Sequence, residues 1–338
     1  MVLLRALART ARMIKHAPHL AEALPADDEV LLDTPDERLG PALVAAGQGD
    51  HGPAAKLLAA SREAAEWENR DHYVLRLATF ARGRPEWFTR WRAATPQDPD
   101  VALLRAELAM RHAWESPVRA TLLREVAPLI AVATEAAPRD PVPWRIALDH
   151  ARGVGATHSA FQDLWAEAIH RSPHHYGCHA AALQYLSATW YGSHRTCFDF
   201  AENAAVDTLP GSLIQALPVR AAFACLQEPG RGASSIPIER LDAAADRAIA
   251  LSDAYEKADP YPAEVRNLLA YVLMRLGRAA DALEQLQRIG PYATSFPWNV
   301  ISSDPLGQFL ELRDGVRLQV AAMTPLRRRI GHHRPGLP

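Results

Sequence analysis

Two pairs of histidine and cysteine, each with three-residue spacing, are the part of this chain whose residue types could do chemistry. His175 and Cys178 stand in HHYGCH, and His194 and Cys197 stand in ATWYGSHRTCFDFA. Four such side chains could ligate zinc, and a cysteine beside a histidine could act as a nucleophile. Which chemistry is open to them depends on the elements that carry the two pairs.

Helical periodicity dominates those elements. After residue 36, apolar residues recur three and four positions apart, without the sustained alternation that is typical of strands. Proline precedes or begins successive helical patterns, because the first turn of a helix tolerates its missing N–H. These prolines are Pro99, Pro141, Pro173, Pro210 and Pro260. The sequence therefore predicts an all-α fold divided into units of about 33 to 50 residues.

Two of these units share a detailed pattern. Gly155 and Gly277 mark turns, a small residue follows each glycine five positions later (Ala160 and Ala282), and a leucine comes four positions after that. The pattern resembles the tetratricopeptide repeat, a helix-turn-helix of about 34 residues whose small residue lets the two helices approach closely. The resemblance implies a superhelical solenoid of antiparallel helical hairpins, although an unrelated all-helical fold would share part of the pattern.

The sequence patterns divide the chain into four regions. They are an N-terminal amphipathic and basic extension (1–35), an N-terminal helical region (36–95), the repeat array (96–300), and a C-terminal helix with a basic tail (301–338). The extension could dock on the body of the protein or on a membrane surface, but no stretch reaches the roughly 20 apolar residues of a membrane span.

The three irregularly spaced cysteines do not form a disulfide framework, which indicates a reducing environment. We therefore expect a cytoplasmic protein.

The charge balance gives no general preference for nucleic acid. Lysine and arginine number 37 against 39 aspartate and glutamate, for a net charge of −2. The tail TPLRRRIGHHRPGLP could bind RNA or an acidic partner, but a solvated, partly ordered terminus is the favoured interpretation. We therefore expect partners to be recognised locally.

The repeat register can be applied to the two histidine and cysteine pairs. It predicts a helix from about His175 to Trp190, a turn at Gly192 and a second helix that starts at Ser193. Gly192 would be the left-handed residue that ends the first helix, and Ser193 would accept the free N–H groups of the second.

This register places the two pairs too far apart for one metal ion. Zinc requires its ligands within about 2.3 Å of one point. Cys178 and His194 are sixteen residues apart, which is about 24 Å along a helix. We therefore expect neither a metal nor another cofactor. Cys197 stands five residues after Gly192, where the other units have alanine, and is expected to be a small buried hydrophobe.

A catalytic alternative remains open. His194, Cys197 and Asp199 are the candidate catalytic residues, because a helix N-terminus and a nearby histidine would favour a thiolate. With His179 they could line a pocket near the irregular third and fourth repeats, where Pro218 in the fourth unit should kink or split a helix. The protein would then be an enzyme or an accessory subunit of one.

The preferred interpretation is a non-enzymatic scaffold that binds a peptide or a partner domain. In a tetratricopeptide-like array the first helix of each hairpin lines a concave groove. The register places nine candidate binding residues there: Arg145, Asp149, Arg152, Tyr176, His179, Glu264, Asn267, Tyr271 and Arg275. Ordinary solvated helix faces are the alternative for each, and neither the partner nor the oligomeric state is indicated.

The segment WYGSHRTCFDFA carries a second resemblance. It is similar to a group of uncharacterised bacterial, mainly actinobacterial, helical-repeat proteins, in which a Trp-x-Gly-Ser-His joint is followed by Phe-x-Phe-Ala. The likeness covers residues 140 to 230. It implies a helical-repeat fold and a bacterial cytoplasmic setting, and it implies no activity.

Overall fold

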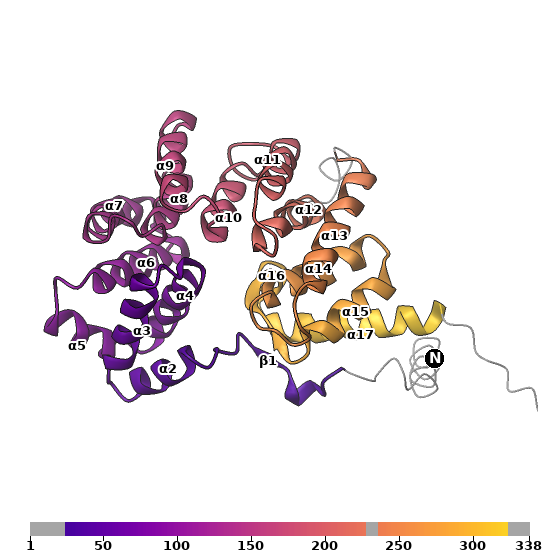
Figure 1. Cartoon of the computed structure of the whole chain (residues 1–338), viewed down its shortest axis with the longest axis horizontal. Helices are drawn as coiled ribbons and strands as arrows, with labels where there is room; N and C mark the ends of the chain where they lie inside the picture. Colours follow the sequence, from indigo (N-terminus) through magenta and orange to yellow (C-terminus); the bar gives the residue numbers. More distant parts are fainter. Residues whose placement is uncertain (1–23, 228–235, 324–338) are drawn as a thin grey trace, which may run out of the picture. The chain divides into compact units, whose positions relative to one another are not determined.

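The computed structural model describes residues 24–227 and 236–323, which form sixteen α-helices and two strands of two residues each (Figure 1). The all-α prediction is therefore confirmed. Within these ranges no helix combines the length and the apolar character needed to cross a membrane. The expectations for most of the N-terminal extension and for the basic tail concern residues outside the described ranges.

The chain divides into two compact units, with boundaries after Asp33 and Tyr255. This division falls inside the array predicted over 96–300. The larger unit holds α2 (Leu39–Gly47), α3 (Gly52–Glu63), α4 (Trp67–Gly83), α5 (Glu86–Ala94), α6 (Pro99–Glu115), α7 (Arg119–Ala136), α8 (Val142–Val154), α9 (His158–Arg171), α10 (Tyr176–Tyr185), α11 (His194–Val206), the 3-10 helix η3 (Leu213–Ala216), α12 (Leu217–Gln227) and α13 (Ile238–Asp253).

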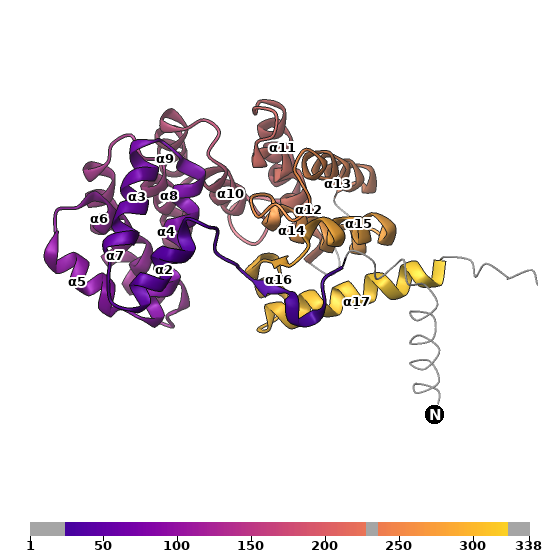
Figure 2. The same cartoon turned by 60° about the horizontal axis from the view of Figure 1, so that its bottom comes forward.

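Most helices of the larger unit pack on the next helix in sequence, as in a series of hairpins. A second set of contacts joins alternate helices: α2 packs on α4, α4 on α6, α6 on α8, α8 on α10 and α10 on α12. α4 also contacts α8 and α10, and Figures 1 and 2 both show α4 close to α6 and α8. Helix faces that were expected to line an open groove therefore meet one another around α4.

Proline begins or immediately precedes helices, as predicted. α6 starts at Pro99, where Asp98 caps the helix by accepting the N–H of Asp100 at 2.9 Å. α8 follows Pro141 directly. Pro218 stands in the first turn of α12, after η3, so the predicted split of this helical segment is confirmed.

The two units that share the repeat pattern are both helical hairpins. Gly155 and Gly277 join them in the left-handed conformation, with φ of 73° and 77°. Ala282 is fully buried, as expected, but Ala160 is exposed. The assignment of Ala160 to the helix contact was wrong because α9 turns its neighbour Phe161 toward the core instead.

The joint between α10 and α11 differs from its prediction in two respects. α10 ends at Tyr185 rather than near Trp190. Gly192 is not left-handed; it is required because a Cβ there would lie 2.0 Å from the carbonyl oxygen of Leu186. The chain therefore folds back onto the end of α10. Ser193 caps α11 as predicted, accepting a backbone N–H of its first turn at 3.1 Å.

The smaller unit combines the end of the chain with residues 24–33. It holds α14 (Ala263–Arg275), α15 (Ala279–Ile289), α16 (Ser295–Ile301) and α17 (Pro305–Met323). The strand β1 (Leu31–Leu32) pairs in parallel with β2 (Tyr292–Ala293), next to α16 in Figure 2. Early residues of the chain are thus fixed to its C-terminal helices.

We predict that Gly192→Ala destabilises the larger unit by at least about 2 kcal/mol, because the added Cβ must displace the backbone at Leu186. Urea unfolding followed by tryptophan fluorescence measures the loss. Gly40→Ala in α2 is the matched control, since its Cβ would meet its nearest atom at 4.0 Å. Equal stability of the two variants would contradict the close approach at Gly192.

Candidate functional site

A network of buried charges joins α3, α4, α6 and α8. Arg70 of α4 is fully buried, and its Nε donates to Asp140 at 2.6 Å. Its Nη2 donates to Asp100 at 2.6 Å and its Nη1 to the carbonyl oxygen of Leu58 at 2.7 Å. A buried charge needs such partners, because the water it has lost must be replaced. One guanidinium thereby ties four segments together.

Both aspartates that hold Arg70 lie at the beginnings of helices. Asp100 stands in the first turn of α6, and Asp140 accepts the N–H of Val142 in α8 at 2.9 Å. The N-terminus of a helix favours negative charge, because its N–H groups and its dipole point toward the anion. Each of these two carboxylates is therefore stabilised both by Arg70 and by the start of a helix.

Arg145 of α8 forms a second centre of the network. Its Nε and Nη2 donate to one oxygen of Asp71 in α4, at 3.0 and 2.9 Å. Its Nη1 lies 2.8 Å from Glu107 in α6, and Asp149 stands 3.6 Å away. Glu107 also pairs with Arg111 at 2.8 Å. The three helices α4, α6 and α8 are thus joined a second time.

Burial and pairing shift the pKa values of this second centre in different directions. Burial raises the pKa of Asp71 to about 6, although Arg145 opposes the rise. Burial opposes ionisation of Glu107 too, but Arg145 and Arg111 together outweigh it and lower its pKa. Burial would also lower the pKa of Arg145, yet Asp71, Glu107 and Asp149 outweigh it and raise that pKa. At neutral pH the centre is ionised, and it disfavours any packing that leaves one charge alone.

The start of α10 rests on the same part of α4. Glu68 accepts the N–H of Tyr176 at 2.7 Å. A Cβ on Gly177 would lie 2.1 Å from a carboxylate oxygen of Asp71, so only glycine allows this approach. The contact between α4 and α10 therefore depends on glycine at position 177, which the repeat pattern did not predict.

The structure brings the first histidine and cysteine pair into contact. His175 Nδ1 lies 3.2 Å from Cys178 Sγ, and His175 Nε2 lies 3.9 Å from Asp71. This order of thiol, imidazole and carboxylate is that of a catalytic triad. However, both His175 and Cys178 are completely buried, and burial raises the thiol pKa well above its usual value and lowers the pKa of His175. His175 Nδ1 instead accepts the N–H of Cys178 at 3.2 Å and caps α10.

The second pair does not provide a reactive thiol. Cys197 is buried, with its Sγ 3.4 Å from the carbonyl oxygen of Leu183, and burial raises its pKa to about 12. Burial therefore disfavours the thiolate that the catalytic alternative requires, and the expectation of a small buried hydrophobe is confirmed. His194 is buried at the start of α11, and Asp199 pairs with Arg240 at 2.8 Å.

The two pairs begin successive helices. Cys178 lies in the first turn of α10, whereas Cys197 contacts Leu183 near the other end of that helix. In the part of the chain that the structure describes, no group of three or more histidine, cysteine, aspartate or glutamate side chains could hold a metal ion.

Several residues predicted to line a groove contact one another instead. Arg152 stacks on Trp114 and Trp190, 4.3 and 4.7 Å from the ring centres, and donates to Asp149 at 3.2 Å. Trp190 belongs to the joint between α10 and α11, within the segment ATWYGSHRTCFDFA. Through Trp190 this segment contacts Arg152 near the end of α8. Together with Arg145, these predicted residues are engaged within the larger unit.

The other candidates at α10 are also held internally. His179 is buried, with Nδ1 3.0 Å from the carbonyl oxygen of His175 and its ring edge-on to Trp165 at 4.9 Å. Burial lowers the pKa of His179 to about 4. The hydroxyl of Tyr176 accepts from Arg220 at 3.2 Å.

The remaining predicted binding residues belong to the smaller unit. Asn267 is fully buried; its amide donates to the carbonyl oxygen of Tyr292 at 3.0 Å and accepts from Trp298 at 2.9 Å. Arg275 is exposed and donates to the Tyr271 hydroxyl at 2.7 Å, and Glu264 is half-buried. Binding by the nine residues stays a prediction, and the structure divides them between the two units.

Arg70, Asp71, Glu107 and Asp140 were not predicted from the sequence. A signal for the first two exists, because Arg70 and Asp71 stand seven residues before buried Leu77 and Ala78, on the inward side of α4. Charged residues at such positions are almost never fully buried unless paired. That signal indicates an ion pair, but it does not identify the partner.

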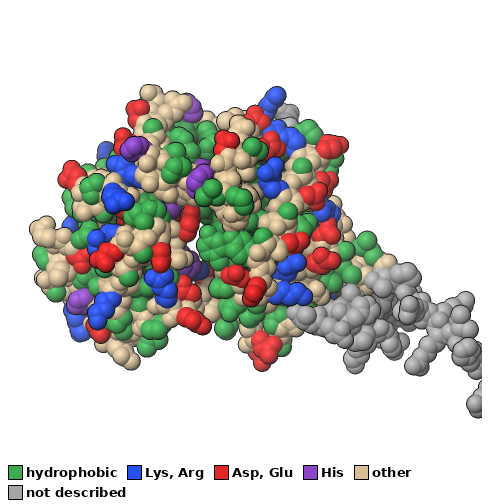
Figure 3. Space-filling model, viewed as in Figure 1, with side chains coloured by type: hydrophobic (Ala, Val, Ile, Leu, Met, Phe, Trp, Pro, Cys, Tyr) green, Lys and Arg blue, Asp and Glu red, His purple; other side chains and the backbone are tan. Residues whose placement is uncertain are grey.

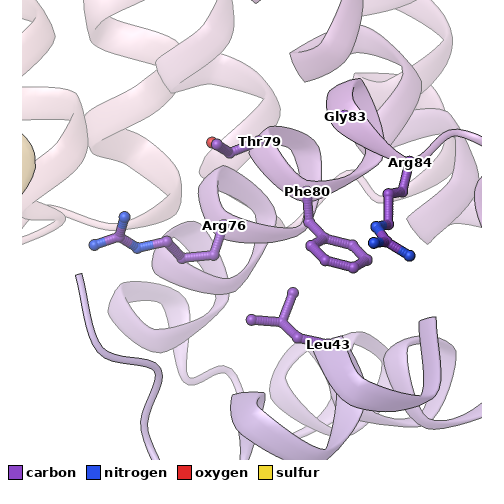
Figure 4. A pocket seen from close by; sticks show the side chains of 6 residues that line it. All are labelled: Leu43, Arg76, Thr79, Phe80, Gly83 and Arg84. Carbon is purple, nitrogen blue, oxygen red and sulfur yellow. The ribbon is translucent and has the colours of Figure 1, made fainter. Parts of the chain in front are cut away.

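An open hollow lies elsewhere on the larger unit, between α2 and α4. We call it the α2–α4 groove; its volume is about 400 Å³ and it is lined by Leu43, Arg76, Thr79, Phe80, Gly83 and Arg84. Figure 4 shows Leu43 pointing toward the ring of Phe80, with Arg84 beside that ring and Arg76 extending from the other end. Leu43 and Phe80 are half-buried, and Thr79 is exposed. The sequence analysis did not identify this groove.

The groove has an apolar floor and basic ends. Two of its six lining residues are arginines and none is acidic. Arg84 is exposed, and its guanidinium makes no hydrogen bond or ion pair with the described residues. Val44, the neighbour of Leu43 on α2, leaves 64 % of its surface exposed. Apolar and basic side chains thus occur together in the lining of this groove.

Comparison of the chain with protein-family models, with curated proteins and with solved structures finds no match.

We predict that His179 makes the larger unit less stable in acid. Its pKa falls from 6.5 to about 4 on folding, so the unfolded chain binds the proton first and stability decreases as pH falls from 6.5 to 4. Urea unfolding at several pH values should show a loss of about 3 kcal/mol in the wild type that is absent from His179→Asn.

The comparison of the two proteins isolates His179, because Asp71, with its raised pKa, acts in the opposite direction over the same range in both. His170→Asn, at an exposed position of α9, is the control. Parallel pH profiles for wild type and His179→Asn would contradict the assignment.

Proposed function

We propose that this protein is a non-enzymatic scaffold that binds a peptide or a partner domain. The α2–α4 groove is the observation that carries the proposal. It is open, it presents Leu43 and Phe80 at its floor, and helices rather than mobile loops hold most of its lining. Sites of this kind, with an apolar floor and a few placed polar groups, are the usual form of peptide-binding and ligand-binding surfaces.

A tetratricopeptide-like array is the fold that we propose for the larger unit. Its support is the packing of each hairpin's first helix on the next, from α2 through α12, and the left-handed glycine at the turn of α8 and α9. Buried Cys197 stands where the pattern calls for a small residue. Such arrays present helix faces to partners. The likeness of residues 140–230 to actinobacterial helical-repeat proteins remains part of this proposal.

The charged and sulfur-bearing groups of the larger unit favour a structural interpretation over an enzyme. All three cysteines are free and buried, and Cys178 and Cys197 have raised pKa values because of that burial. Free thiols agree with the proposed reducing, cytoplasmic setting. Figure 3 shows basic and acidic side chains mixed over the visible faces, which gives no support to a nucleic-acid surface.

A blocking variant tests the proposal. Thr79→Trp should fill the groove while leaving the fold intact, because Thr79 is exposed and its hydroxyl bonds only its own helix, at the carbonyl oxygen of Leu75. Peptides selected from a random display library on the wild type should bind at least ten-fold more weakly to Thr79→Trp in fluorescence anisotropy. The wild-type Kd should lie in the micromolar range.

Thr134→Trp on α7 is the matched control, since Thr134 makes the same kind of bond to its own helix at 2.8 Å. It should bind the selected peptides as the wild type does. If no selected peptide distinguishes Thr79→Trp from Thr134→Trp, the groove is not a binding site and the proposal fails.

A further inference from the structure

We infer that the α2–α4 groove recognises an acidic segment of another protein, in which an apolar side chain lies between two carboxylates. The inference rests on the proposed function and specifies its partner. The floor formed by Leu43 and Phe80 would take the apolar side chain, and Arg76 and Arg84 would face the carboxylates. Each part of this partner corresponds to a feature of the groove.

Arg84 supplies the clearest evidence for an acidic partner. Its guanidinium lies beside the groove without a hydrogen bond or ion pair to the described residues, and it is exposed. Other exposed arginines of the larger unit, such as Arg105, also have no carboxylate partner in the described part of the chain, but Arg84 is the one that stands beside the apolar floor of the groove. A guanidinium presents a rigid set of donors that matches a carboxylate, so a partner's acidic side chain would satisfy Arg84 directly.

The spacing of the two arginines restricts the partner further. Arg76 in α4 and Arg84, the residue that follows its end, are eight positions apart in the sequence. Phe80 lies midway between them in the sequence. The partner's carboxylates should therefore lie on either side of the apolar side chain that contacts Phe80.

Charge complementarity selects an external partner over the ends of this chain. The sequence near the N-terminus contains Arg5, Arg9 and Arg12, and the end contains Arg327, Arg328, Arg329 and Arg334. These basic segments would meet two more arginines at the groove, and like charges repel. A single apolar contact with two ion pairs also covers far less than the roughly 1,200 Å² of a stable interface, so we expect a transient complex.

A charge reversal tests the chemistry of the partner. Peptides that depend on the groove, identified by weaker binding to Thr79→Trp, should carry aspartate or glutamate on both sides of an apolar residue. Their affinity should fall at least ten-fold on Arg84→Glu and should be restored when the facing acidic residue of the peptide is replaced by lysine. Arg105→Glu, at an exposed position of α6, is the control and should leave binding unchanged.

Other outcomes separate the two proposals. Groove-dependent peptides without acidic residues, or acidic ones that Arg84→Glu binds equally well, would overturn the inference and leave the scaffold proposal standing. If no peptide depends on the groove, both proposals fail. Groove-dependent binding of a peptide with the sequence of residues 1–20, or a dimer in sedimentation velocity that Thr79→Trp dissociates, would replace the acidic partner by the chain itself.

Discussion

The pairing of two buried arginines is the constraint on which the larger unit depends. Arg70 and Arg145 have lost their hydration, and each can be charged inside the protein only where carboxylates from other helices surround it. Those carboxylates come from α4, α6, the middle of α8 and the segment before α8. A helix that shifted by one turn would leave a charge unpaired, at a cost of several kcal/mol. The network therefore selects one packing of the helices, even though the raised pKa of Asp71 shows that the pairing does not fully offset burial.

The same network bears on where we propose that a partner binds. In an open helical array the first helices of the hairpins would present their faces to solvent, but here α4 contacts both α8 and α10, and the faces between them carry the paired charges. Glu68 and Gly177 bring the start of α10 onto α4. The hollow between α2 and α4 lies outside this closed arrangement, with Leu43 and Phe80 accessible. Internal charge pairing and the proposed external binding surface are thus consequences of one packing.

Local signals in the sequence predicted much of the fold. Prolines marked helix starts, Ser193 was identified as a cap, and Gly155 as a turn, because each feature depends on neighbouring residues alone. The internal contacts of the candidate binding residues could not be predicted in the same way. Arg145 looked like a solvated or partner-facing side chain because its partners Asp71 and Glu107 are 74 and 38 positions away in sequence. Gly192 was correctly recognised as special but for the wrong reason, since its close contact with Leu186 is a feature of the folded joint.

A double-mutant cycle on Asp71 and Arg145 tests the central claim most directly. Asp71→Asn, Arg145→Met and the double variant would be unfolded in urea at pH 8, where Asp71, with its pKa of about 6, is ionised. We expect each single variant to lose about 3 to 5 kcal/mol. The double variant should lose less than the sum, by at least about 1.5 kcal/mol, because it leaves fewer charges unpaired. Losses that add to within about 0.5 kcal/mol would show that the two residues do not act together, and the claim that buried pairing selects the helix packing would be contradicted.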